Sequence, residues 1–194
     1  MRQRFALAAA LACAALAGSA SAQPNNPFGP DFKPGDISPY VDSRPDWKEG
    51  DTVLPAYPQA SNLIEFSAGA LSSFRFFVDA ESISPGADGI VRYTLVARSS
   101  SGNDNVSFSG LRCKTAEHRL FANGRTSDKT WVPQRDSPWK VVEVKAYNRQ
   151  HLVLMRDFFC PAAVPIMTRA EGIDALRKGF HPHAIGYHPG ADRF

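Results

Sequence analysis

The sequence predicts an α+β fold in which an antiparallel β-meander is followed by two C-terminal helices. Three observations indicate this class. Apolar residues alternate with period two through much of residues 63–122, as they do in half-buried strands. Turn-forming segments such as 84–89 (SPGADG) separate these runs. From about residue 146 the apolar spacing becomes helical, and strands followed by helices are typical of α+β domains.

Four segments have the alternation of strands: 63–66, 72–83, 90–99 and 105–115. The last two flank the turn-forming SSGND at 100–104 and have similar lengths, so we expect them to pair as an antiparallel hairpin. In 72–83, Phe77 has the opposite parity to Phe74, Phe76 and Val78. This indicates a sheet that is covered, at least in part, on both faces.

The strand 105–115 has an irregular pattern, because its apolar residues change parity halfway: Val106, Phe108, Leu111 and Cys113. A regular strand keeps one parity inside, and a β-bulge supplies the extra residue that a change requires. Glycine within a strand pattern often marks such a place. We therefore predict a bulge near Ser109–Gly110 that turns Cys113 inward. The alternative is that the strand ends at Ser109 and a new one begins.

A further strand is expected at 118–122, closed by a turn at Asn123-Gly124. Two helices follow. The first is predicted over 146–159, where Leu152, Met155, Phe158 and Phe159 recur at helical spacing. The second is predicted over 168–179, because Thr168 and Glu171 form a capping box and Gly179 follows basic residues at its end.

Residues 1–22 have the pattern of a cleavable signal peptide. Arg2 and Arg4 precede an apolar run and a small-x-small site, which places the cut after Ala22. No other stretch is apolar enough to span a membrane. The alternative is a lipid anchor on Cys13, although the apolar run before that residue is short. Removing two arginines lowers the formal charge from +3 to +1, which gives no electrostatic footprint for nucleic acid.

The expected mature chain keeps two cysteines, Cys113 and Cys160, separated by 47 positions. In an exported protein they most simply form one disulfide, because the compartment is oxidising. On the predicted outline this bond clamps the first helix onto the bulged strand. A redox-active cysteine and two free thiols are the alternatives, but there is no C-x-x-C pair.

Composition divides the rest of the chain. Residues 23–46 carry six prolines, which exclude regular structure and predict a flexible leader. A single domain is expected over 47–180, followed by an irregular tail at 181–194. The tail contains His181, His183 and His188, which could bind a metal, but no recognised ligand spacing completes such a site.

No catalytic template is present: the sequence lacks a G-x-S-x-G elbow, an H-E-x-x-H pair and a P-loop. An acid–base set could come from His118, His151 and Asp157, although the last two are poorly placed to share one helix face. Glu117, Asp79 and Glu81 are candidate paired carboxylates with nothing to fix their geometry. Five aromatic residues could line a groove or fill the core: Trp47, Trp131, Trp139, Tyr93 and Tyr147.

The segment RYTLVARSSSGNDNVSFSGLRC, followed by Trp139 and DFFCP, resembles the CNP-one-like family of exported proteobacterial proteins. The similarity covers roughly residues 47–179 and includes Cys113 and Cys160. The resemblance implies an exported bacterial protein and supplies no catalytic residues.

These observations together favour a periplasmic protein that binds an envelope partner or a ligand, with no cofactor and no catalytic residues assigned. One alternative is an envelope-associated structural protein, lipid-anchored if Cys13 is modified. The other is a hydrolase with an unrecognised site near His118 or His151, which requires a cleft holding one of these residues in contact with a second polar group.

Overall fold

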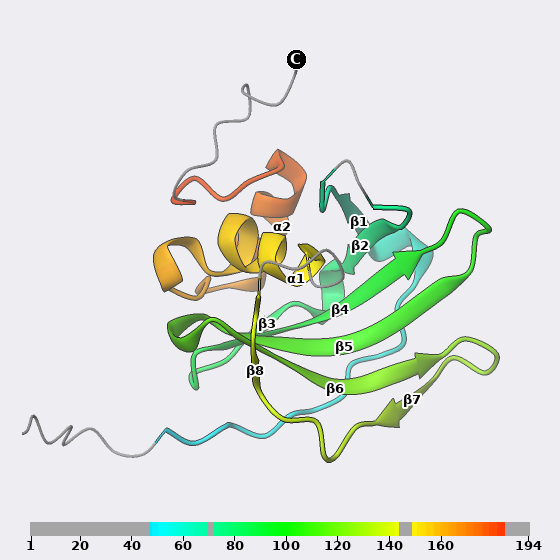
Figure 1. The fold of residues 1–194 in the computed structure, drawn as a ribbon, viewed down its shortest axis with the longest axis horizontal. Coiled ribbons are helices and arrows are strands. Elements are labelled where there is room, and N and C mark those ends of the chain that lie inside the picture. The colour runs from blue at the N-terminus through cyan, green and yellow to red at the C-terminus, as the bar shows by residue number, and fades with distance from the viewer. Residues whose placement is uncertain (1–46, 70–71, 144–148, 185–194) are drawn as a thin grey trace, which may run out of the picture. The chain divides into compact units, whose positions relative to one another are not determined.

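The computed structural model describes residues 47–69, 72–143 and 149–184 (Figure 1). The expected signal peptide and leader, and residues 185–194 of the expected tail, lie outside these ranges. Within them, no helix is long and apolar enough to cross a membrane.

An antiparallel meander forms the centre of the described structure, as predicted (Figure 1). Its main path follows the order β1-β2-β4-β5-β6-β7, while β3 pairs with β4 and β8 pairs with β6. The strands are β1 Leu63–Phe66, β2 Arg75–Asp79, β3 Ser84–Pro85, β4 Ile90–Arg98, β5 Asp104–Arg112, β6 Glu117–Arg125, β7 Thr130–Pro133 and β8 Lys140–Val141.

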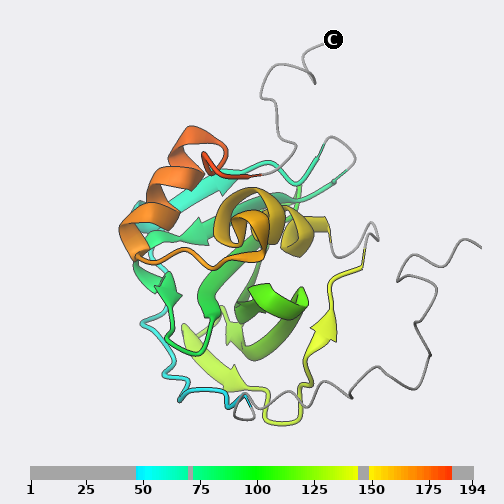
Figure 2. The same ribbon diagram turned by 90° about the vertical axis from the view of Figure 1, so that its left-hand side faces the viewer.

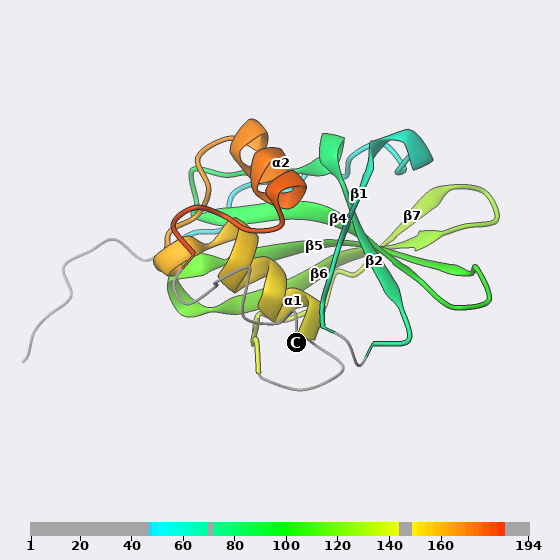
Figure 3. The ribbon, with the colours of Figure 1, turned by 90° about the horizontal axis from the view of Figure 1, so that it is seen from above.

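Helices cover one face of this sheet, here called the helix face (Figures 1 and 3). Helix α1, Arg149–Val153, continues directly into a π-helical segment, Leu154–Phe159. The predicted helix 146–159 is therefore confirmed from Arg149 onward, and 146–148 lie outside the described residues. Helix α2, Arg169–Lys178, begins at Thr168, whose side chain accepts the Glu171 N–H. It ends at Gly179 in the left-handed conformation that glycine adopts without strain.

The π-helical segment changes which residues face the sheet. The backbone N–H of Cys160 donates to the carbonyl of Met155, five residues earlier. The wider turn brings Phe158, Phe159 and Cys160, which are consecutive, into the core together. A regular α-helix would spread three consecutive side chains over most of its circumference.

The opposite face is covered by an extended segment, residues 47–59, here called the strap (Figures 1 and 2). Tryptophan side chains hold it in place. Trp131 donates to the carbonyl of Pro55, Trp139 donates to Glu49, and Trp47 in the strap donates to the carbonyl of Asp88. The predicted cover on both faces is confirmed. Phe77 packs with residues of other strands and with Tyr57 of the strap, away from the helices.

A bulge is present beside Ser109, close to where it was predicted, but it lies in the neighbouring strand β6 and not in β5. Strand β5 pairs with β4 in unbroken register along its whole length. The shift occurs against β6, between the pairs Phe108–Ala122 and Ser109–Leu120, so the extra residue is Phe121. The prediction that β5 itself changes face was wrong, and so was the alternative that it ends at Ser109. Its apolar residues change parity because both faces are buried.

The predicted turn at Asn123-Gly124 was also wrong, since β6 continues through both residues and the turn follows at 126–129. Gly124 serves a packing purpose instead. A Cβ atom there would lie 2.7 Å from the Cβ of Val106 and 3.0 Å from the ring of Tyr57. The glycine lets the strap approach the sheet closely.

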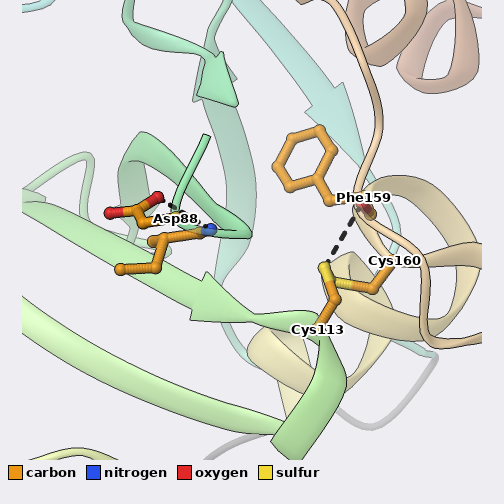
Figure 4. Close-up of a disulfide and its surroundings, with 5 residues drawn as sticks. Asp88, Cys113, Phe159 and Cys160 are labelled. Carbon is orange, nitrogen blue, oxygen red and sulfur yellow. Dashed lines mark hydrogen bonds between the residues drawn. A yellow bond between two sulfur atoms is a disulfide. The ribbon is translucent and has the colours of Figure 1, made fainter. Parts of the chain in front are cut away.

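A disulfide joins Cys113 and Cys160, as predicted, with their Cα atoms 5.3 Å apart (Figure 4). Cys113 follows the end of β5, and Cys160 follows the π-helical segment. The Cys113 sulfur also lies 3.8 Å from the carbonyl oxygen of Phe159, a packing contact because a disulfide sulfur carries no proton to donate. The bond links the sheet to the helical layer.

Candidate functional site

Strand β6 places His118 on the helix face of the sheet. His118 lies opposite Leu111 of β5 and opposite Lys140 of β8, and directly opposed residues point to the same face. Leu111 belongs to the core under the helices. The bulge at Phe121 then reverses the parity of β6, so that Ala122 packs on the strap face. The bulge thus allows one strand to supply side chains to both layers.

Helix α1 places His151 directly against His118. The two imidazole rings are stacked, with centroids 3.8 Å apart and planes inclined by 28°. On its other side His151 meets the core, where its Nδ1 lies 2.8 Å from the hydroxyl oxygen of Tyr93. Tyr93 lies in the middle of β4 and is fully buried. The structure therefore joins three polar side chains from β4, β6 and α1.

These residues border a pocket of about 330 Å³, here called the histidine pocket. This volume lies at the lower end of the range of small-molecule sites. Two short segments complete the wall, the loop before β8 and β8 itself with the residue that follows it. The lining residues are His118, Leu120, Ser137, Pro138, Lys140, Val141, Val142 and His151.

The electrostatics of the pocket keep both imidazoles neutral near pH 7. Burial lowers the pKa of His118 to about 4, and the positive charge of Lys140 contributes to the shift. Burial also holds the pKa of His151 well below its usual value, with a further contribution from His118. Burial raises the pKa of the Tyr93 hydroxyl, so the phenol keeps its proton.

The hydrogen bonds of the pair are incomplete. A fully buried phenol proton needs an acceptor, and His151 Nδ1 is the acceptor in reach, so Tyr93 donates and His151 carries its own proton on Nε2. Nε2 of His118 is buried and has no hydrogen-bond partner among the described residues. A buried polar atom without a partner costs about 1–3 kcal/mol, so His118 is kept at this place at the expense of stability.

The other predicted acid–base candidates do not join this pair. Asp157 is buried but binds the Arg156 guanidinium, with Oδ2 2.7 Å from Nη2. The candidate carboxylates are engaged separately. Glu117 accepts from Arg112 and from Thr115, Asp79 accepts the Glu81 N–H, and Glu81 pairs with Arg169.

The histidines of the expected tail have different surroundings. His181 is buried and fully hydrogen-bonded: its N–H donates to the Asp157 carbonyl, Nδ1 accepts from His183 N–H, and Nε2 donates to Glu171. His183 is exposed, and His188 lies outside the described residues. Over the described ranges, no three histidine, cysteine or acidic side chains converge as metal ligands would.

Sequence reasoning identified both histidines but not Tyr93, Ser137 and Lys140 as their neighbours. For Tyr93 a signal existed. A tyrosine in the centre of an apolar face implies a buried hydroxyl that needs a partner, and a histidine on the covering helix can supply it. The aromatic candidates Trp131 and Trp139 are partly buried, pack against the core and hold the strap, and Tyr147 lies outside the described residues.

Comparison with known proteins gives two matches. The model of the CNP1-like family matches residues 42–177. Cryptic neisserial protein 1 of Neisseria gonorrhoeae is 26% identical over 139 residues, which cover 64% of this chain and 68% of the relative. No solved structure is significantly similar.

Proposed function

The chain belongs to the CNP1-like family, and from its histidine pocket we propose that it is an exported, periplasmic binding module for a small molecule. The observation that carries the proposal is the stacked pair His118–His151, which lines a pocket and leaves a buried nitrogen without a partner. The Tyr93 hydroxyl accounts for His151, whose Nδ1 accepts its proton, but no described core group requires the second imidazole, His118, which is buried at a desolvation cost.

Two features support export. The first 22 residues have the charge and apolar pattern of a signal peptide. The two remaining cysteines are joined in a disulfide, a bond that persists in oxidising compartments. The intact mass of the protein recovered from the periplasm should correspond to a start at Gln23. A lipid-modified Cys13 at the start would support the anchored alternative instead.

A hydrolase is the second candidate, because the cleft that it requires is present, with two imidazoles in contact. Binding is favoured over catalysis for a chemical reason. An imidazole whose pKa is about 4 is a weak general base near neutral pH. The residue that orients His151 is a neutral phenol, whereas an acid–base histidine is commonly oriented by a carboxylate.

The test is a ligand screen with a blocked pocket. A mixture of small acidic, neutral and basic compounds is added to the exported protein, and the imidazole NMR signals of His118 and His151 are followed. We expect a subset of compounds to shift both signals. Leu120→Trp, which fills the pocket, should abolish the shifts. Val53→Trp adds the same side chain at a site that is 81% exposed and should leave them unchanged. If no compound shifts either signal in the unmodified protein, the proposal is wrong.

A further inference from the structure

The charged side chain that lines the histidine pocket is positive. Among its lining residues Lys140 is a cation, the two histidines can each donate one N–H, and Ser137 offers a hydroxyl. No aspartate or glutamate lines the pocket in the described part of the chain. A ligand cation would therefore meet Lys140 without a counter-charge, whereas an anion would meet a charge of opposite sign.

The donors of the pocket suit an acceptor ligand. His151 carries its free proton on Nε2, because Tyr93 occupies Nδ1. Lys140 lies directly opposite His118 in the β6–β8 ladder, so its side chain leaves the sheet on the same face, and both residues line the pocket. His118 is neutral near pH 7, because burial, and after it the charge of Lys140, lowers its pKa. Lys140 is therefore the one formal charge among the described lining residues, and an anion is the ligand that it attracts.

The remaining half of the wall is apolar: Leu120, Pro138, Val141 and Val142. An inorganic anion such as phosphate gains nothing from this surface and must lose part of its hydration beside it. A ligand with a hydrocarbon body would bury it, at about 25 cal/mol for each Å² removed from water. With one lysine in the lining, one negative charge on the ligand is matched and a second is not.

We infer that the histidine pocket binds small monocarboxylic acids with an apolar body. The carboxylate meets Lys140 and the imidazole N–H groups, and the hydrocarbon part lies against Leu120 and Val142. This inference rests on the proposed binding function and names its ligand class. It depends on the charge and shape of the lining, whereas the binding function itself requires only an accessible pocket.

Four probes separate the two claims: hexanoate, 1-hexanol, hexylamine and inorganic phosphate. The first three share one hydrocarbon chain and differ in the charge of the head group. Each is titrated into the exported protein while the His118 and His151 imidazole signals are followed by NMR. We expect hexanoate to bind at least about tenfold more tightly than 1-hexanol, since a hydrogen bond to a charged group contributes about 1.5–3 kcal/mol. Hexylamine and phosphate should bind more weakly than 1-hexanol.

Lys140→Met removes the cation and keeps the length of the side chain. In this variant hexanoate should lose its advantage of about tenfold while 1-hexanol binding is retained. Lys129→Met, in the exposed turn at the far end of β6, is the matched control and should preserve the preference. If 1-hexanol binds as tightly as hexanoate, the ligand class is wrong and the binding function stands. If phosphate binds best, the site is an inorganic anion site. If none of the four shifts the signals, both claims lose their support.

Discussion

The histidine pair should make the protein less stable in mild acid, and His118 provides a measurable part of this effect. In the unfolded chain His118 titrates near its usual pKa of 6.5, whereas in the folded protein burial lowers the pKa to about 4. Between these values the unfolded state binds more protons than the folded state. The free energy of unfolding therefore falls as the pH decreases through this window and levels off below the folded pKa.

The magnitude follows from the two pKa values. Between about pH 7.5 and about pH 5, His118 alone should remove about 2 kcal/mol from the free energy of unfolding, and the full shift corresponds to about 3 kcal/mol. His151 acts in the same direction, because its pKa is lowered as well. Some carboxylates, such as Asp88 and Asp104, have lowered pKa values. Their contribution to the free energy of unfolding is lost only as the pH falls below their usual pKa values near 3.8, outside this window.

Urea unfolding of the disulfide-intact protein, followed by tryptophan fluorescence at several pH values, measures the effect. His118→Gln cannot titrate and should show a pH dependence smaller by about 2 kcal/mol over the same interval. His183→Gln, at an exposed histidine, is the control and should retain the full dependence. The reasoning fails if His118→Gln and the unmodified protein lose the same stability between these pH values, whatever their stabilities at neutral pH.

Three further predictions concern the scaffold. Thiol titration of the denatured, unreduced protein should find no free cysteine, and two reactive thiols would contradict the structure. Reduction should lower the free energy of unfolding by about 4 kcal/mol, the value that the chain-entropy model gives for a separation of 47 residues. Gly110→Ala should cost about 1–3 kcal/mol in urea unfolding, because the new Cβ would lie 2.7 Å from the ring of Phe121; an unchanged midpoint would show that the ring can move. Asp88→Asn should cost about 3–5 kcal/mol in the same assay, because it leaves Arg92 buried without its counter-charge, and a loss below about 1 kcal/mol would mean that the pair is open to water.

The architecture could be predicted because each layer leaves a simple pattern in the sequence. The period-two alternation of 90–99 predicts a strand, although β4 is buried on both faces, and the helical spacing after residue 149 reports the side of the helical segment that packs into the core. The capping box at Thr168 and Glu171 specifies a helix start locally, without knowledge of any neighbour. The disulfide followed from two cysteines and an inferred compartment.

The errors arose where one element's pattern depends on another element. The parity change in 105–115 reports which residues are buried, but not whether the cause is an extra residue or cover on both faces. In the structure the extra residue is Phe121 on the neighbouring strand. Gly124 suggested a turn by its type, yet it is glycine because Val106 and Tyr57 occupy the space of a side chain. Such a contact between distant segments leaves no local signal.

The candidate site could not be predicted for the same reason, because it also depends on contacts between distant segments. His118 and His151 belong to different layers, and neither has a motif around it that indicates the other. Two features bring the rings together. The bulge at Phe121 lets β6 direct His118 toward the helices, although Ala122 faces the strap. The disulfide then fixes the end of the helical segment that begins with α1, and so limits how far His151 can slide over the sheet. Because both constraints act on the same two imidazoles, the irregular part of the sheet and the covalent link are best understood as the supports of the pocket.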